Sequence, residues 1–252
     1  MDKLTQKASS ANEARRATIN LARLAQMGIL TRDGARSSGG EAFRLIKRTV
    51  LGRAHAPASG SEQPANLVLV SSAVPGEGKT FCSVNLAMSI AMELDHTVLL
   101  VDADVARPAI PALLGLGRAP GLMDLLLDPA LTLNELILPT NIEGLSLLPA
   151  GRRHHNAAEL LASAAMHGVL AELASRYADR IVVFDSPPIL LTSEAGVLAG
   201  QMGQVLLVVE SEITTRRAVD EALRRLGHCA RVDLICNKAR AFAGDEYDSY
   251  YD

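Results

Sequence analysis

A lysine and a threonine follow a run of small residues at the end of a buried strand. The segment Ala73–Thr80 reads Ala-Val-Pro-Gly-Glu-Gly-Lys-Thr and follows the apolar run Leu67–Ser72. Small residues let backbone N–H groups wrap a phosphate, and the N-terminus of the next helix adds partial positive charge. Lys79 would reach the β- and γ-phosphates, and the Thr80 hydroxyl would hold Mg²⁺. The segment therefore predicts a phosphate loop for Mg·ATP, with Ala73 in place of the usual first glycine. A glycine-rich turn without a ligand is the alternative.

Two further strands end in carboxylates. Asp102 and Asp104 leave the end of the apolar run Val98–Val101, and Asp185 directly follows Ile181–Phe184. Ligands of parallel sheets bind at the carboxyl ends of the strands, so we expect these aspartates beside the phosphate loop. The first pair can hold Mg²⁺ through water and accept a proton from a nucleophile. Asp185 is expected on the Mg²⁺ side. A turn or a helix cap is the alternative for the first pair.

A side-chain amide follows the last expected strand. Asn237 lies at the end of the expected strand Val232–Ile235, where it could hydrogen-bond the edge of an adenine; an asparagine in a turn is the alternative. The residues expected to contact the nucleotide are Pro75, Gly76, Glu77, Gly78, Lys79, Thr80, Phe81 and Asn237.

The C-terminal end is acidic and rich in tyrosine. Three of the four tyrosines, Tyr247, Tyr250 and Tyr251, lie in the last six residues. So few apolar neighbours make a core position for these aromatic rings implausible. They either bind a partner or are substrates. Tyr177 lies in a helical segment before a strand, where its hydroxyl is expected to be fixed.

The remaining pattern alternates apolar runs with helical segments, which predicts a parallel sheet covered on both faces. Strands are expected at 67–72, 98–101, 145–148, 181–184, 205–209 and 232–235, and helices at 79–94, 157–177 and 214–227. The expected fold class is α/β, with a doubly wound, mostly parallel sheet.

The first 65 residues are expected to form helices and a linker, without the alternation of strands and helices. Helices are expected at 12–28 and 40–52, separated by Gly39-Gly40, and an Ala/Pro/Ser/Gly-rich linker at 54–65. This segment carries eleven Lys/Arg against five Asp/Glu. It could touch a membrane surface or an acidic partner, or simply be a solvated helix face. The expected division is an N-terminal extension at 1–65, a phosphate-loop domain at 66–239 and a tail at 240–252.

The composition argues against a membrane-spanning, secreted or nucleic-acid-binding protein. No apolar run approaches the roughly 18 residues of a membrane span, and the first ten residues lack the apolar stretch of a secretory signal. Cys82, Cys229 and Cys236 have no metal-ligand spacing, so we expect reduced core residues of a cytosolic protein. Without tryptophan, and with four phenylalanines and four tyrosines, base stacking is poorly supported and no nucleic-acid partner is expected.

These motifs together resemble those of the bacterial tyrosine kinases, phosphate-loop enzymes of the MinD/ParA-like class. The resemblance runs from Gly40 to the C-terminus and rests on Pro75–Thr80, Asp102-x-Asp104, Asp185-Ser-Pro-Pro and the terminal tyrosines. Supporting stretches are Leu148-Pro-Ala-Gly151 and Asn156-x-x-Glu159-Leu-Leu-x-Ser163. Details such as Asp104-Val-Ala-Arg-Pro108 resemble the soluble autokinases of exopolysaccharide, exosortase-associated loci.

The resemblance implies an ATP-dependent autokinase that phosphorylates its terminal tyrosines and regulates exopolysaccharide synthesis and export. Asp102 would be the base facing the tyrosine hydroxyl, and Lys79, Asp104 and Asp185 would complete the catalytic set. The tail would act in a neighbouring subunit of a ring. A transmembrane polysaccharide chain-length regulator would be the activator, holding this cytoplasmic protein at the inner membrane.

The family's oligomerisation motif, Glu-x-x-Arg-x-x-Arg, reads Glu41-x-x-Arg44-x-x-Lys47 here. A lysine cannot make the bidentate carboxylate contact of an arginine, which weakens the implied interface. Arg48 points about 100° away on an ideal helix and is a poor substitute.

Two other classes of function compete with this interpretation. A MinD/ParA-type ATPase switch would carry a second lysine early in the loop, where this chain has Val74, and needs no tyrosine cluster. A non-catalytic, ATP-sensing subunit of an export complex would not need the full set of Lys79 and three aspartates.

Overall fold

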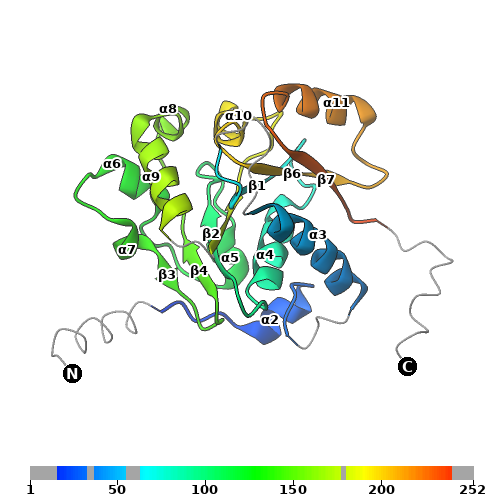
Figure 1. The fold of residues 1–252 in the computed structure, drawn as a ribbon, viewed down its shortest axis with the longest axis horizontal. Helices are drawn as coiled ribbons and strands as arrows, with labels where there is room; N and C mark the ends of the chain where they lie inside the picture. Colours follow the sequence, from blue (N-terminus) through cyan, green and yellow to red (C-terminus); the bar gives the residue numbers. More distant parts are fainter. Residues whose placement is uncertain (1–15, 33–36, 55–62, 177–179, 240–252) are drawn as a thin grey trace.

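Seven strands form one sheet in the computed structural model, which describes residues 16–32, 37–54, 63–176 and 180–239 (Figure 1). The strands are β1 Leu67–Ser72, β2 Thr97–Asp102, β3 Leu138–Pro139, β4 Leu145–Leu148, β5 Arg180–Asp185, β6 Gln204–Glu210 and β7 Val232–Asn237. Their order is β3-β4-β2-β5-β1-β6-β7, and all neighbours are parallel except β3 and β4. The prediction of a mostly parallel α/β sheet is confirmed.

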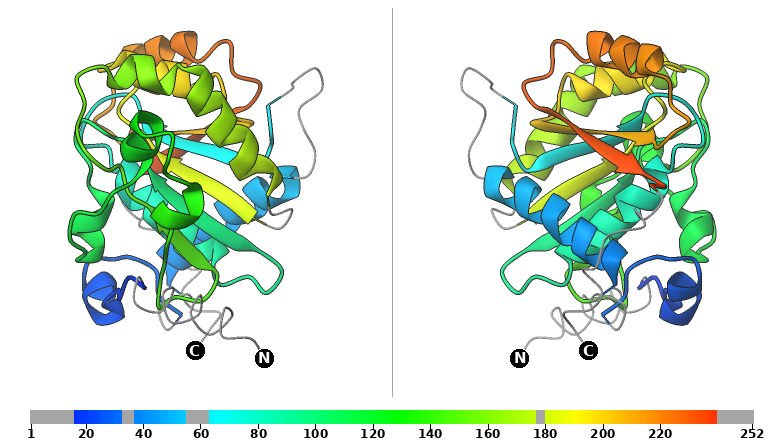
Figure 2. Two further views of the ribbon diagram at one scale, coloured as in Figure 1. Left: turned by 90° about the vertical axis from the view of Figure 1, so that its left-hand side faces the viewer. Right: turned by 90° about the vertical axis from the view of Figure 1, so that its right-hand side faces the viewer.

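Helices cover both faces of the sheet, as the two views of Figure 2 show. On one side lie α2 Leu21–Gln26, α3 Ser38–Ala54, α4 Lys79–Ile90 and α5 Ile110–Leu114. On the other lie α6 Leu122–Leu127, α7 Leu133–Leu136, α8 Ala157–Leu161, α9 Ala164–Ser175, α10 Ser193–Ala199 and α11 Arg216–Arg225. Successive side chains of a strand point to opposite faces. Leu67 and Leu69 of β1 therefore join the core on the α9 side, while Val68 and Val70 join the core on the α4 side.

The segment before β1 contributes to the core of the domain. Phe43 and Val50 of α3 and Leu24 of α2 are buried in the same hydrophobic cluster as α4. Burying each side chain of this size contributes about 1.5–3 kcal/mol. The N-terminal residues therefore help to hold α4, whose first turn carries the phosphate loop.

In its described part, the predicted helix at 12–28 is confirmed only over Leu21–Gln26. Residues 16–19 are not helical, and Ala17 pairs with Thr140 beside β3. The helix starts at Leu21 because the Asn20 side chain caps it by accepting a hydrogen bond from the Arg23 N–H. Gly39-Gly40 was expected to separate two helices, but both glycines lie inside α3.

The single helix expected at 157–177 is also wrong. Ser163 has an extended backbone and caps a new helix, because its hydroxyl accepts a hydrogen bond from the Met166 N–H. The chain therefore forms α8 and then α9. The short strand β3 and helices α5, α6, α7 and α10 were not predicted.

Of the three cysteines expected in the core, only Cys82 is buried; Cys229 is half-buried and Cys236 is exposed, and all three are free thiols. Burial raises the pKa of the Cys82 thiol to about 12 and that of Cys229 to about 11, so both stay protonated at neutral pH. Among the described residues, no helix is long and apolar enough to cross a membrane.

Candidate active site

The segment after β1 folds into a loop that only glycine can complete. Gly76 and Gly78 have φ values of 92° and 95°, in the left-handed region. A Cβ atom on Gly78 would lie 2.2 Å from the side-chain amide of Asn237. Helix α4 begins at Lys79, immediately after this glycine, so the free N–H groups of its first turn point into the loop.

A buried carboxylate holds the loop from inside. Glu77 is only 2% exposed, and its Oε2 accepts a hydrogen bond from the Val74 N–H at 2.8 Å. Its other oxygen accepts the hydroxyl of Thr214, which follows β6. The sequence predicted a nucleotide contact for Glu77, whereas the structure directs its carboxylate to the loop's own backbone and to Thr214.

Two residues at the end of β7 brace the loop from outside. The Asn237 Nδ2 donates to the Glu77 carbonyl at 2.8 Å, and the Lys238 Nζ donates to the Gly76 carbonyl at 2.9 Å. Lys238 also pairs with Glu210 at 2.9 Å. One N–H of the Asn237 amide is therefore engaged by the loop, which leaves its second N–H and its oxygen for the contact with adenine that the sequence suggested. The sequence did not identify Thr214 or Lys238 as contacts of the phosphate loop. The only signal for such a contact was the position of Lys238 directly after Asn237.

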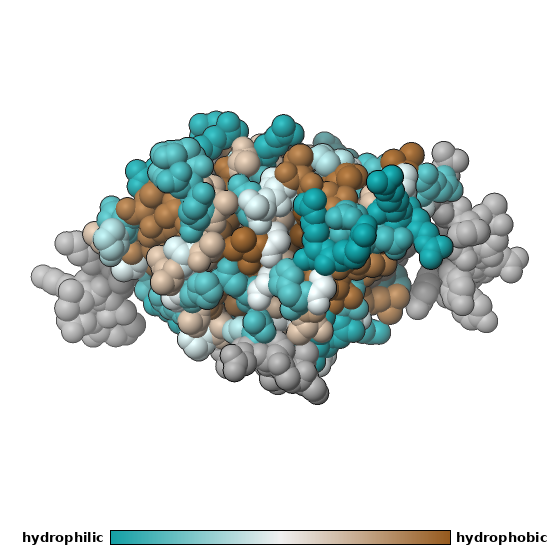
Figure 3. All heavy atoms as spheres, turned by 90° about the horizontal axis from the view of Figure 1, so that it is seen from above, coloured by the Kyte–Doolittle hydropathy of each residue, from teal (hydrophilic) through white to brown (hydrophobic). Residues whose placement is uncertain are grey.

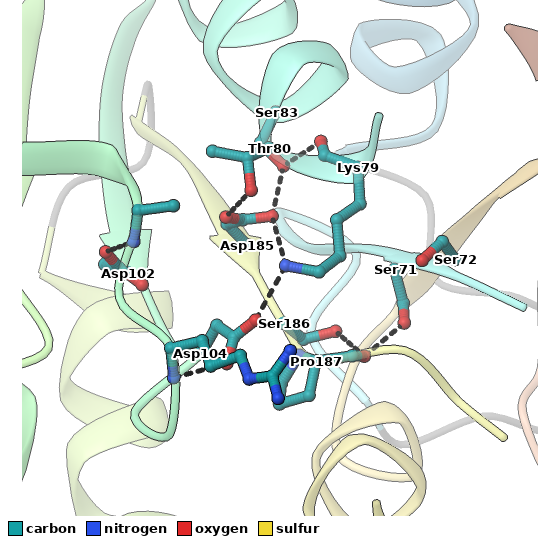
Figure 4. Close-up of polar contacts among 12 residues, drawn as sticks. Ser71, Ser72, Lys79, Thr80, Ser83, Asp102, Asp104, Asp185, Ser186 and Pro187 are labelled. Atoms are coloured by element: carbon teal, nitrogen blue, oxygen red, sulfur yellow. Dashed lines mark hydrogen bonds and ion pairs between the residues drawn. The ribbon is translucent and has the colours of Figure 1, made fainter. Parts of the chain in front are cut away.

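The phosphate-loop lysine lies between two carboxylates from neighbouring strand ends (Figure 4). The Lys79 Nζ is 2.7 Å from Asp104 Oδ2 and 3.9 Å from Asp185 Oδ1. Thr80 donates its hydroxyl to Asp185 Oδ2 at 2.7 Å, and Ser83 donates to Asp185 Oδ1 at 3.1 Å. Four of the residues were expected here; Ser83, one helical turn after Thr80 on α4, was missed.

Asp102 lies beside this cluster but is turned towards the next loop. It pairs in register with Asp185 across β2 and β5 and is 1% exposed. Its Oδ2 accepts the N–H groups of Ala109 and Ile110, each at 3.1 Å, and its Oδ1 is buried without a hydrogen-bond partner among the described residues. Burial, together with the nearby negative charge of Asp185, raises the pKa of Asp102 to about 7. A carboxylate with this pKa is suited to accept a proton near neutral pH.

The oxygen donors fit a Mg²⁺ ion that is completed by phosphates. Burial raises the pKa of Asp185 to about 6, against the opposing charge of Lys79 and the hydrogen bonds from Thr80 and Ser83. No three His, Cys, Asp or Glu side chains in the described ranges converge closely enough to hold a metal alone. Mg²⁺ commonly binds through one or two carboxylates, water and substrate phosphates, which matches the Thr80 hydroxyl with the Asp104 and Asp185 carboxylates.

Other predicted site residues lie away from the loop. The ring of Phe81 packs edge-on against Phe43 of α3, with centroids 6.4 Å apart, so only its backbone is left for a nucleotide. Arg44 and Glu41 form an exposed ion pair of 2.7 Å on α3. Tyr177 and the three terminal tyrosines lie outside the described residues.

Lys47, the third residue of the predicted oligomerisation motif, is turned into its own subunit. It is 7% exposed and pairs with Glu93, just after α4. An interface through this motif would therefore rest on Glu41 and Arg44.

Comparison with known proteins agrees with this geometry. Residues 63–197 match the ParA family model, described as NUBPL iron-transfer P-loop NTPase. The kinase domain of VpsO is 30% identical, with a TM-score of 0.68, and the match covers 79% of this chain and 93% of that domain. The chain belongs to the ParA-like P-loop NTPases, in the group that contains the bacterial tyrosine kinases. The resemblance deduced from the sequence is thereby confirmed, and the loop is a nucleotide-binding site.

Two relatives extend the comparison over the chain. Tyrosine-protein kinase YwqD of Bacillus subtilis is 28% identical over 89% of this chain and 92% of its own length. EpsB of Ralstonia solanacearum is 35% identical over 67% of this chain, but the match covers only 22% of EpsB. The chain thus corresponds to nearly all of YwqD and to about a fifth of EpsB.

Proposed function

We propose that this chain is an ATP-dependent protein-tyrosine autokinase that phosphorylates Tyr247, Tyr250 and Tyr251. The observation that carries the proposal is the position of Lys79, 2.7 Å from Asp104, at the start of a helix whose free N–H groups face the loop. On nucleotide binding, Lys79 exchanges Asp104 for the β- and γ-phosphates. Its positive charge then stabilises the charge that develops on the transferred phosphoryl group.

Asp102 accepts the proton of the tyrosine hydroxyl in this scheme. The phenolic oxygen forms a bond to the γ-phosphorus while the bond from that phosphorus to the ADP oxygen breaks. Asp104 and Asp185, with the Thr80 hydroxyl, would hold Mg²⁺, which would supply further neutralisation of the phosphates. Ser83 keeps Asp185 oriented through its hydrogen bond of 3.1 Å.

The proposal includes a cellular setting. The protein acts in the cytoplasm as a homo-oligomeric ring, in which each tail is phosphorylated by a neighbouring subunit. A transmembrane polysaccharide chain-length regulator activates it and keeps it at the inner membrane, and the activity regulates exopolysaccharide synthesis and export. The relatives named as tyrosine kinases support the kinase activity on which this setting rests.

Incubation of the purified full-length chain with labelled ATP and Mg²⁺ tests the function. We expect label on protein tyrosine, and mass spectrometry should find it on Tyr247, Tyr250 and Tyr251 but not on Tyr177. Changing the three terminal tyrosines to phenylalanine should remove self-labelling and leave ATP affinity unchanged, because the nucleotide contacts lie in the loop. Released phosphate without protein label would instead indicate an ATPase switch, and binding alone a sensing subunit. Strong label on the triple variant would count against the tail.

We expect assembly to depend on the exposed pair of α3. Replacing Glu41 and Arg44 with alanine removes an exposed ion pair whose partners can reach a second subunit, so light scattering should show a shift towards monomer. Arg216→Ala with Asp220→Ala removes a similar exposed pair from α11 and should leave the mass unchanged.

Phosphorylation should shift the mass in the same direction as the α3 variant. Each phosphate adds about −1.5 to −2 charge to a tail that already carries Asp245, Glu246, Asp248 and Asp252. That charge repels the site's carboxylates and any bound nucleotide phosphates. Identical masses for the dephosphorylated, phosphorylated and α3-variant proteins would refute assembly through this helix.

A further inference from the structure

A cavity opens beside the catalytic carboxylates, at the carboxyl ends of β2 and β4. Its volume is about 440 Å³, and we call it the arginine pocket. Its wall is formed by Pro108, Pro111, Arg118, Ala119, Pro120, Asp124, Pro149, Ala150, Gly151, Arg152 and Arg153. Figure 3 looks down on the molecule from above, and hydrophilic side chains there surround hydrophobic ones on the side that carries α6 and α8.

One loop forms a wall of the pocket and also contacts both catalytic aspartates. Pro108 lines the pocket. The N–H of Arg107, on one side of it, donates to Asp104 Oδ1 at 3.0 Å, and the N–H of Ala109, on the other side, donates to Asp102 Oδ2 at 3.1 Å. A peptide side chain in the pocket would therefore lie one loop away from the proposed base.

The pocket carries more positive than negative charge. Its one carboxylate, Asp124, is already used: it pairs with the Arg152 Nε at 3.2 Å and accepts the N–H groups of Gly121 and Arg152. Arg118 and Arg153 are exposed and make no hydrogen bond or ion pair with any part of the chain that the structure describes. Two guanidinium groups are thus left for an acidic ligand.

The shape of the pocket is fixed by close backbone packing. A Cβ atom on Gly121 would lie 1.8 Å from the Pro149 carbonyl, and one on Gly151 would lie 2.2 Å from the Asp124 carboxylate. Gly151 also has a φ of 82°. Both positions therefore require glycine, and close backbone packing shapes the turn that carries Arg152 and Arg153.

We infer that the arginine pocket binds the acidic side chains that flank an acceptor tyrosine, and so selects acidic tyrosine peptides as substrates. Its first occupant is the segment Asp245–Asp252 of a second copy of this chain, where four carboxylates surround three tyrosines. The rings of the lining prolines offer an apolar surface for the aromatic part of such a segment. The inference rests on the proposed function, because it names the substrate class of the same site.

Binding of two labelled peptides separates this inference from the kinase activity. One peptide has the sequence of residues 245–252, and the other replaces each Asp with Asn and each Glu with Gln. The full-length protein carries phenylalanine at its own three terminal tyrosines. Fluorescence anisotropy should show about tenfold tighter binding of the acidic peptide, as expected for two exposed charge pairs at low salt. The preference should shrink as salt rises from about 0.05 M to about 0.5 M.

Arg118→Ala with Arg153→Ala should abolish the preference and leave affinity for the neutral peptide and for ATP unchanged. The matched control, Arg216→Ala with Arg217→Ala, removes the same charge from exposed positions on α11 and should keep the preference. If the peptides are phosphorylated, the pocket variant should raise KM for the acidic peptide about tenfold with kcat within about twofold.

Equal binding of the two peptides by the wild-type pocket would overturn the inference, as would equal loss of preference in the α11 control. Absence of phosphate transfer with the binding preference intact would instead count against the kinase proposal and leave the arginine pocket as an acidic-peptide site.

Discussion

Lys79→Met is expected to lower self-phosphorylation by about 10²–10³-fold or more, the loss typical when one electrostatic contact to a developing charge is removed. The ammonium group lies 2.7 Å from Asp104 and 3.9 Å from Asp185, and only 13% of the side chain is exposed. Methionine fills a similar volume but carries no charge. The measurement is transfer of label from ATP to the terminal tyrosines, beside nucleotide affinity.

Lys238→Met is the matched control, because this second lysine also contacts the phosphate loop. Its Nζ donates to the Gly76 carbonyl and pairs with Glu210, but half of its side chain is exposed at the outside of the loop. We expect weaker nucleotide binding by a few-fold and retained labelling. Circular dichroism must show that Lys79→Met is folded, since it leaves two buried carboxylates without their cation. A folded Lys79→Met protein that labels its tyrosines at the wild-type rate would refute the assigned site.

The sequence was sufficient for the parts of the site that depend on local pattern. A strand that ends in small residues followed by Lys79 and Thr80 is compatible with few structures other than a phosphate loop. Apolar strands that end in Asp102 and Asp185 must present those side chains at the same edge of a parallel sheet. Strand pairing then brings Asp102 beside Asp185, as the register of β2 and β5 shows. These contacts follow from fold class and motif together.

Contacts between distant segments were not predictable in this way. Thr214 reaches Glu77 across 137 positions of sequence, and no local pattern marks it as part of the loop. Lys47 was placed in an interface by its motif spacing, yet its partner Glu93 belongs to the same subunit. Pairing of this kind depends on how α3 packs on α4, which periodicity alone does not specify.

Helix ends were the least predictable part of the fold. Asn20 and Ser163 lie within apolar periodic segments, and each begins a new helix by accepting a backbone N–H. A capping side chain accepts a single hydrogen bond from a backbone N–H, and this bond competes with continuation of the helix through the capping residue. Tertiary contacts decide the outcome: at Ala17, pairing with Thr140 favours an extended chain over the first turns of the expected helix.

Asp102→Asn should keep nucleotide binding and lose phosphoryl transfer by about 10²–10⁴-fold, the range for loss of a general base. Asparagine can keep a carbonyl oxygen towards the N–H groups of Ala109 and Ile110, so the loop after β2 should hold its place. Its amide nitrogen would then take the place of Asp102 Oδ1, which has no hydrogen-bond partner among the described residues. An amide nitrogen cannot accept the tyrosine proton. Rates of tyrosine labelling should therefore fall while the fold and the affinity for nucleotide stay close to wild type.

Asp104→Asn provides the comparison, because this carboxylate contacts Lys79 and not the Ala109–Ile110 backbone. Removing its charge takes away a ligand for Mg²⁺, so the affinity for Mg·ATP should fall together with the rate. Each variant replaces one carboxylate oxygen with an amide NH2 group. The two positions lie two residues apart at the end of the same strand. Titration of each with Mg·ADP, beside single-turnover labelling, separates loss of binding from loss of transfer. Equal losses of nucleotide affinity in both variants would make Asp102 a second metal-side carboxylate and leave the tyrosine proton without its assigned acceptor.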